Sequence, residues 1–255
     1  MAIQDFLVTH HVFTTAEFSR AFPNSQTDRN LLSRAVHSGK VERVRRGVYV
    51  SKTGPFSRTS ASPFDIAEAV AGDAAFAYAS ALQLHGVLHN LTRRVQFWTV
   101  HKLTSFTYDS QDYAPHHPRR QTVETQTLFT PSGRTYRVTT REQTLLDCLD
   151  RPGLAGGPEN LLRSLSGLSY LDATKAAQLA ADASYSTRAR LGWTLQTRRE
   201  AWSVPNSALS VLHENLGSGP SYFWSSADPR DSHWVNTWKL YLPEPEEEMA
   251  AWLNS

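Results

Sequence analysis

Residues 14–50 constrain the fold of this chain more than any other segment, because two short capped helices are followed directly by an arginine-rich hairpin. Thr14 and Glu17 have the spacing of a capping box, in which each side chain binds a free amide at the start of a helix. Ser25 is suited to begin a further helix and Gly39 to end it, since serine caps helix N-termini and glycine caps C-termini. This order of elements predicts a winged helix-turn-helix.

The helix predicted over residues 25–38 has one apolar and one polar side. At 100° per residue, Leu31, Leu32, Ala35 and Val36 form a single stripe that can pack on a core. In the major groove, Asn and Gln pair bidentately with adenine and Arg with guanine, whereas a plain solvated face, the alternative here, is richer in Glu and Lys. We therefore expect DNA contacts from eight side chains: Ser25, Gln26, Thr27, Arg29, Asn30, Ser33, Arg34 and His37.

The hairpin expected over residues 40–52 has a cationic tip, because arginines alternate with valines and Gly47 permits a tight turn. Phosphate and minor-groove contacts position a protein on DNA without a strict reading of the base sequence. We expect such contacts from the basic residues of the hairpin: Lys40, Arg43, Arg45 and Arg46. Asn30 and Arg34 of the preceding helix are expected to govern the choice of sequence.

Positive charge is concentrated in the first quarter of the chain. Residues 1–60 contain nine Lys and Arg against four Asp and Glu, a net charge of +5. The whole chain carries only +2, so the remaining 195 residues carry −3. Because neutralisation of phosphates supplies most nonspecific affinity for DNA, this segregation places the expected DNA-binding surface in residues 1–60.

Composition restricts the remaining possibilities. The 255 residues are 40% hydrophobic and 20% charged, a normal globular composition with room for one large domain or two to three small ones. We find no apolar run of eighteen residues and no export signal, so we expect a cytoplasmic protein without a membrane partner. The single cysteine, Cys148, lies in an apolar helical segment and is predicted to be a packed core thiol rather than a nucleophile.

The chain changes character at residues 51–63, which are rich in Ser, Thr, Gly and Pro and are interpreted as a linker. We predict a DNA-binding domain over 1–60 and a larger region over 61–255, with a subdivision near 150–158 left open. Periodicity predicts an α+β fold for this region, with helices at 64–72, 78–86 and 140–150, a strand at 94–100, a hairpin of 121–130 with 134–140, successive helices from 158, and two aromatic strand segments before a final helix.

Five segments together resemble the AbiEi family of antitoxins and transcriptional regulators, from bacterial type IV toxin–antitoxin and abortive-infection systems. They are FTTAEF (13–18), LLSRAVHSGKVERVRRGVYV (31–50), YASALQLHGV (78–87), VTTREQTLLDCLDRPGLAGGPENLL (138–162) and RLGWTLQ (190–196). Many winged helices share the second segment, and its combination with the fourth makes the resemblance more specific.

This resemblance implies a winged N-terminal domain that binds duplex DNA at inverted repeats in its own promoter and acts as a repressor of its operon. It also implies a C-terminal region that counters a nucleotidyltransferase-type toxin encoded beside it, with direct contact between the two proteins left open. The alternative is a free-standing transcriptional regulator whose later region binds a small ligand or forms a dimer.

Histidine clusters offer no convincing metal or catalytic site. His85 and His89 have the i, i+4 spacing that can bind zinc on a helix, but Gly86 lies between them and the glutamate of an HExxH motif is missing. His116 and His117 are interpreted as part of a flexible, partly cationic surface loop, with an additional phosphate contact as the alternative.

Acidic residues also fail to complete a catalytic motif. Asp228 and Asp231 invite comparison with the metal-binding acids of nucleases, but no E-x-K or D-x-K sequence occurs in the chain. The P-loop, the Gly-Ser and D-x-D pattern of a nucleotidyltransferase and the G-x-S-x-G elbow are also missing. We therefore expect no enzyme activity and no cofactor, with a metal-dependent nuclease as the best catalytic alternative.

Overall fold

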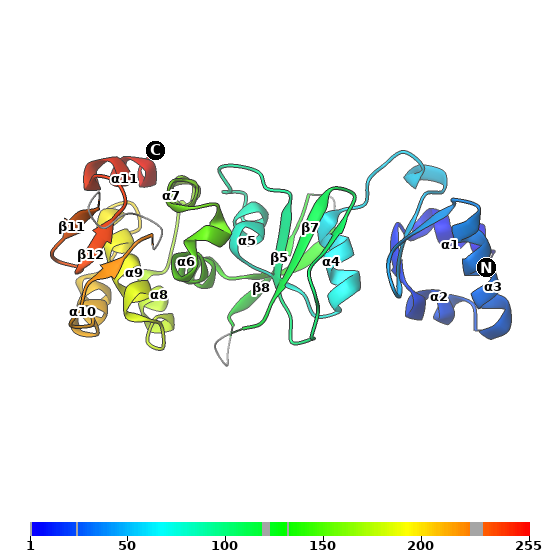
Figure 1. Cartoon of the computed structure of the whole chain (residues 1–255), viewed down its shortest axis with the longest axis horizontal. Helices are drawn as coiled ribbons and strands as arrows, with labels where there is room; N and C mark the ends of the chain where they lie inside the picture. The colour runs from blue at the N-terminus through cyan, green and yellow to red at the C-terminus, as the bar shows by residue number, and fades with distance from the viewer. Residues whose placement is uncertain (1, 24, 119–122, 132, 225–231) are drawn as a thin grey trace. The chain divides into compact units, whose positions relative to one another are not determined.

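The structure of the chain, a computed structural model, describes residues 2–23, 25–118, 123–131, 133–224 and 232–255 (Figure 1). Helices and strands are both present, so the α+β class predicted from the sequence is confirmed. The residues divide into two compact units. The first consists of Met1–Ala74, Arg93–Val95 and Thr99–Pro115, and the second of Ala75–Thr92, Gln96–Trp98 and His116–Ser255.

The first unit begins with α1 (Ile3–Thr9), β1 (Val12–Thr14), α2 (Thr15–Ala21), α3 (Ser25–His37), β2 (Val41–Arg45) and β3 (Val48–Ser51), which we call the winged module. Its strands form an antiparallel sheet in the order β1-β3-β2. The predicted capping box of α2 is present, since Thr14 N donates to Glu17 Oε2 at 2.7 Å and Glu17 N donates to Thr14 Oγ1 at 3.1 Å. Two helices and a hairpin follow one another as the sequence predicted for a winged helix-turn-helix, and α1 and β1 are additional elements.

Aromatic side chains form the core of the winged module. Phe6 meets Phe13 and Phe18 edge-on, with ring centroids 5.2 and 5.4 Å away. α3 adds its predicted apolar stripe to this core. Leu32 and Ala35 are buried, and Leu31 and Val36 are partly buried. The amphipathic character predicted for α3 is therefore confirmed, and its polar side is left for the surface.

The sheet of the winged module is buried on both faces. Neighbouring residues of a strand point to opposite sides, so Val48 and Val50 point away from the aromatic core that Tyr49 contacts. Both valines are buried, and α4 (Pro63–Ala71) contacts β1 and β3. Residues beyond position 60 therefore help to cover this sheet, and the domain boundary at residue 60 stays a prediction.

The segment interpreted as a linker begins with packed residues. Ser51 Oγ donates to the carbonyl of Leu7 at 2.7 Å. The short 3-10 helix η1 (Gly54–Phe56) follows, and the Phe56 ring stacks on His11 with centroids 4.2 Å apart. This first part of the segment is therefore folded against α1 and β1 rather than free.

A second sheet has six strands in the order β6-β7-β5-β4-β9-β8. They are β4 (Ala75–Phe76), β5 (Arg94–Trp98), β6 (Phe106–Tyr108), β7 (Gln111–His116), β8 (Thr125–Phe129) and β9 (Thr135–Thr139). The predictions of a strand at β5 and of the hairpin β8–β9 are confirmed, whereas β6 and β7 were not predicted. Asp109 and Ser110 join them with φ angles of 47° and 60°, so an Asp-Ser pair makes a turn usually signalled by Asn-Gly or Asp-Gly.

Helices dominate the second unit: α5 (Tyr78–Leu84), α6 (Arg141–Asp150), η2 (Pro152–Ala155), α7 (Pro158–Ser166), α8 (Ala173–Leu179), α9 (Tyr185–Thr197), α10 (Asn206–Glu214) and α11 (Glu246–Leu253). They share one core, in which Cys148 is fully buried as predicted, and burial raises the pKa of its thiol. Among the described residues, none of the helices has both the length and the apolar composition needed to cross a bilayer.

A small sheet of three strands completes the second unit: β10 (Ser221–Tyr222), β11 (His233–Val235) and β12 (Leu240–Leu242). β12 pairs in parallel with β10 and antiparallel with β11. The last aromatic segment therefore forms two strands, which a turn at Lys239, with a φ of 46°, separates.

Candidate nucleic-acid interface

α3 presents a polar face to the surface. Asn30, Ser33, Arg34 and His37 are exposed. Asn30, Arg34 and His37 follow one another at the i, i+4 and i+7 spacing of a single helix face. Four further residues predicted to contact DNA belong to α3, and their side chains are not among those that the structure describes: Ser25, Gln26, Thr27 and Arg29. The described part of the predicted reading face is thus gathered on one side of α3, whose contacts with β2 place it beside the wing.

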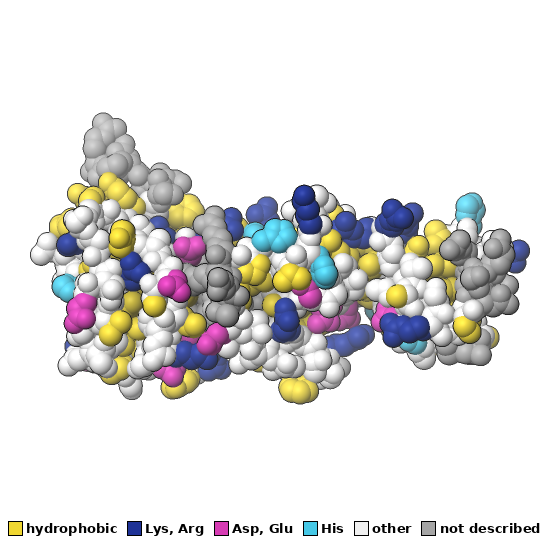
Figure 2. Space-filling model, turned by 90° about the horizontal axis from the view of Figure 1, so that it is seen from below, with side chains coloured by type: hydrophobic (Ala, Val, Ile, Leu, Met, Phe, Trp, Pro, Cys, Tyr) yellow, Lys and Arg dark blue, Asp and Glu magenta, His cyan; other side chains and the backbone are white. Residues whose placement is uncertain are grey.

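The hairpin β2–β3, which forms the wing, exposes most of the predicted basic residues. Lys40, Arg43 and Arg46 are exposed, and Gly47 makes the turn with a φ of 88°. Only Arg45 among the four is half-buried. In the space-filling view, many Lys and Arg side chains (dark blue) reach the surface of the chain (Figure 2).

A β-bulge divides the arginines of β2 between the two faces of the wing. Arg43 pairs with Tyr49, but Arg45 pairs with Val48, so Val44 is the additional residue of β2. Directly paired residues lie on the same face of an antiparallel pair. Arg43 therefore shares the face of Tyr49 and Arg45 that of Val48, whereas an unbroken strand would have put both arginines on one face.

The structure does not place His85 and His89 on one helix. α5 ends at Leu84, and Gly86 turns the chain with a φ of 76°. His85 Nε2 lies 2.9 Å from the carbonyl of Thr139, which can only accept, so this nitrogen donates; burial lowers the pKa of the ring. Within the described residues, no group of three His, Cys, Asp or Glu side chains is arranged to hold a metal ion.

The prediction of a flexible surface loop at His116 is wrong. His116 ends β7 and is half-buried, with its ring edge-on to Tyr78 at 5.1 Å and to Trp98 at 5.8 Å. The sequence misled because Pro115 argues against a strand, since proline cannot donate to a strand ladder. His117 is exposed.

The acidic candidates Asp228 and Asp231 lie outside the described residues.

Sequence reasoning missed a buried polar cluster in the second unit, where segments 78–87 and 138–162 meet. Asp147 accepts from Trp98 Nε1 at 3.1 Å and from Gln143 Nε2 at 2.7 Å. The Arg151 guanidinium lies 5.9 Å from the centroid of the Tyr78 ring. Burial, and then the charge of Asp147, raise the pKa of Tyr78. Residues from segments 78–87 and 138–162 thus contact one another inside the second unit. The cluster could not be predicted because these segments lie far apart in the sequence.

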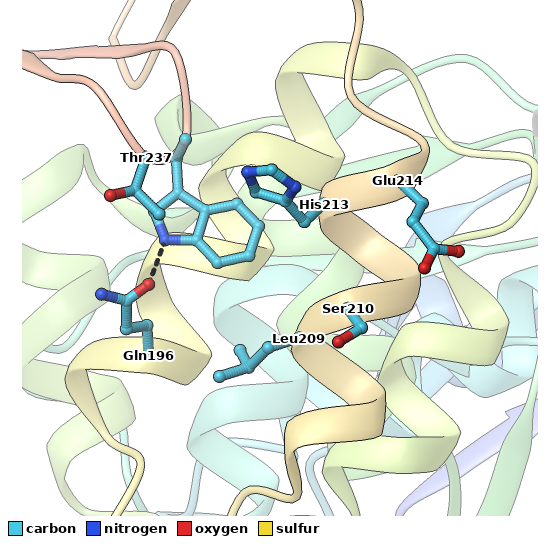
Figure 3. A pocket seen from close by; sticks show the side chains of 7 residues that line it. Gln196, Leu209, Ser210, His213, Glu214 and Thr237 are labelled. Atoms are coloured by element: carbon cyan, nitrogen blue, oxygen red, sulfur yellow. Dashed lines mark hydrogen bonds between the residues drawn. The ribbon is translucent and has the colours of Figure 1, made fainter.

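Two of the hollows that the described residues form lie in the second unit. One, of about 280 Å³, is lined by exposed residues of α10 such as His213 and Glu214, with Trp238 beside them (Figure 3). The Trp238 indole Nε1 donates to Gln196 Oε1 at 2.7 Å, a bond that Figure 3 draws as a dashed line at the labelled Gln196. The other, of about 290 Å³, lies at the end of α6 and is lined by eight residues: Asp150, Arg151, Pro152, Gly153, Leu154, Arg190, Phe223 and Trp224. Both have room only for a small ligand.

Comparison with known proteins agrees with the fold and with the resemblance. Residues 1–52 match the family model described as transcriptional regulator, AbiEi antitoxin, so the predicted resemblance is confirmed. None of the curated proteins compared with the chain matches it. Among solved structures, the crystal structure of the RV2827C protein from Mycobacterium tuberculosis matches with a TM-score of 0.71 and 14% identity, over 99% of this chain and 94% of that chain. This likeness shows a shared fold.

Proposed function

We propose that this chain is a DNA-binding transcriptional regulator that represses its own operon and acts in the cytoplasm as the antitoxin of a type IV toxin–antitoxin system. The observation that carries the proposal is the exposed polar face of α3 beside a wing with exposed arginines. The family match over residues 1–52 supports a regulator role.

The proposed contacts follow from exposure and chemistry. Asn30 and Arg34 would read base edges in the major groove, since amide and guanidinium groups pair bidentately with adenine and guanine. Lys40, Arg43 and Arg46 would contact phosphates and so add affinity without sequence preference. Ser33 and His37 of the same face, with Ser25, Gln26, Thr27 and Arg29 of the preceding turns, complete the proposed surface.

Gel shifts on the region upstream of the protein's own operon test DNA binding. We expect specific binding to inverted repeats and a steep loss of affinity as ionic strength rises, because bound phosphates release counterions. Binding that is undetectable or insensitive to salt would contradict the proposal. A parallel incubation with DNA and divalent metal tests the nuclease alternative, which cleavage of the DNA would favour.

The second unit is proposed to carry the antitoxin activity. Its large core can support a function separate from the DNA-binding face. Full-length Arg34→Ala should then rescue growth when expressed beside the nucleotidyltransferase-type toxin, while the operon stays unrepressed. If Arg34→Ala loses growth rescue together with repression, the chain protects the cell by repressing synthesis of the toxin. Direct contact between the two proteins is then not needed to explain the rescue.

A free-standing regulator with a ligand-binding region is the second candidate. The hollow beside Arg151 and Trp224 favours it, because a guanidinium group and an indole can hold a small anion with a planar ring. The gene neighbourhood separates the two candidates. An adjacent nucleotidyltransferase-like toxin gene supports the antitoxin, and a solitary gene supports the free-standing regulator.

A further inference from the structure

Arg45 contacts the β6–β7 hairpin. Its guanidinium carbon lies 5.0 Å from the centroid of the Phe106 ring, within the range of a cation–π interaction. Its Nη1 atom is buried and has no hydrogen-bond partner among the described residues. A guanidinium held in this way is poorly placed to neutralise a phosphate, unlike the exposed groups of Arg43 and Arg46.

The hairpin that receives Arg45 has a fixed aromatic surface. Phe106 stacks on its cross-strand partner Tyr113, with centroids 4.4 Å apart and ring planes 3° apart. Tyr113 is only 1% exposed. Because the buried Tyr113 ring covers one face of Phe106, the other face is left for Arg45. We call residues 106–116 the supporting hairpin.

A second contact joins the wing to the supporting hairpin. Glu42 pairs with Val50, so it lies on the same face of the wing as Arg45. Burial and the adjacent Glu42 carboxylate raise the pKa of Tyr108, which belongs to β6. The bulge therefore puts Arg45 on the face of β2 that also carries Glu42, and these two side chains meet Phe106 and Tyr108 of β6.

We infer that the supporting hairpin sets the position of the wing, and that Arg45 is a positioning residue for DNA binding rather than a phosphate contact. This inference rests on the proposed function and deepens it. Wing arginines contribute to DNA affinity only when the wing is held at the phosphate backbone. A ligand or partner protein that displaces the supporting hairpin would therefore weaken DNA binding without touching α3 or the wing itself.

DNA affinities of full-length variants across a salt series test this inference. Phe106→Ala removes no charge, yet it should weaken binding to the upstream DNA by about three- to tenfold with an unchanged salt slope. Arg45→Met should cause a similar loss, with a slope that changes by clearly less than one unit. The double variant should bind no more weakly than the weaker single variant, because both remove the same contact.

Phe129→Ala is the matched control, since Phe129 is 80% exposed and belongs to the second unit. It should leave DNA affinity unchanged. If Phe106→Ala does not fold, Phe106→Leu replaces it, because leucine keeps the volume but offers no π face. Normal binding by the Phe106 variant, together with a slope reduced by one unit in Arg45→Met, would overturn the inference and make Arg45 a phosphate contact.

Amide hydrogen exchange without DNA separates this inference from the proposed function. If the supporting hairpin holds the wing, β2 should exchange faster in the Phe106 variant than in the unmodified chain, whether or not the protein binds the upstream DNA. Equal exchange in β2 would overturn the inference. Loss of the proposed function would instead show as missing DNA binding by the unmodified chain.

Discussion

Two helices of equal length, α3 and α9, use their arginines in opposite ways. Each helix has thirteen residues. Arg34 of α3 is exposed, whereas Arg190 of α9 lies in a run of seven consecutive buried positions, 189–195. Arg190 donates from Nε to the Tyr222 carbonyl at 2.8 Å and from Nη1 to the Leu149 carbonyl at 2.7 Å. The exposed arginine is available to a partner, while the buried one joins α9 to α6 and β10.

This difference separates two kinds of motif residue. The segments that carried the family resemblance include parts of both helices, and in those parts α3 exposes Arg34 and His37, whereas α9 buries Arg190 and Thr194. Buried carbonyls need a donor, and burying a charge is tolerated only when it is well hydrogen-bonded. Substitutions in α9 should therefore change stability, and substitutions on the polar face of α3 should change DNA binding with little effect on stability.

Gly192→Ala should cause the largest effect in this comparison. The ring of Trp238 lies against Gly192, and an added Cβ would overlap it. Overpacking of this kind should cost about 3 kcal/mol, which exceeds the gain of roughly 1 kcal/mol from the helix propensity of alanine. Urea denaturation measures the loss. Gly219→Ala is the control, because a Cβ there meets no atom within 4 Å, and equal stabilities of the two variants would show that α9 is not tightly packed.

Arg34→Ala should have the next largest effect, which should fall on DNA binding and not on the stability of the fold. We expect a loss of about 1 to 3 kcal/mol on the upstream DNA and little change on random DNA, because a base contact is removed. Its free energy of unfolding should stay within about 0.5 kcal/mol of the unmodified chain, since Arg34 is exposed. Equal losses on both DNAs would contradict the assigned role. Arg199→Ala, at an exposed arginine after α9, serves as the control.

Local signals predicted the winged module well. The apolar stripe of α3, the capping box at Thr14 and the hairpin around Gly47 each depend on residues close in sequence, and all three are present. The burial of Cys148 could also be predicted, because the leucines on either side of it in α6 must pack against a core.

Features that depend on distant partners could not be predicted. The bulge at Val44 reverses the face of Arg45, and no residue type at that position signals it. The Asp109-Ser110 turn is an uncommon pair for a two-residue hairpin, so β6 and β7 were missed. Tyr78 has a φ of 52°, a conformation that only its tertiary surroundings can impose on a bulky residue.

Arg46→Ala should have a smaller effect than Arg34→Ala and one of a different kind. Removing a phosphate contact should weaken binding to upstream and random DNA equally and reduce the salt slope by about one unit. Arg46→Lys keeps the charge and should keep the slope, which makes it the matched control. A loss confined to the upstream DNA would instead assign Arg46 to base reading and remove the distinction between the wing and α3.

His85→Gln should give the smallest effect, and only on the pH dependence of stability. Burial lowers the pKa of His85 in the folded chain below the ordinary value of 6.5, so the unfolded chain binds the proton more readily. The stability that comes from the neutral ring is therefore complete above pH 6.5 and is lost as the pH falls below it.

Glutamine can still donate to the Thr139 carbonyl but does not titrate. Urea midpoints measured from pH 8 down to pH 5 should fall less steeply for His85→Gln than for the unmodified chain, while the salt slope of DNA binding is the same for both. Urea midpoints that fall equally steeply for both proteins would show that protonation of the His85 ring is not linked to folding.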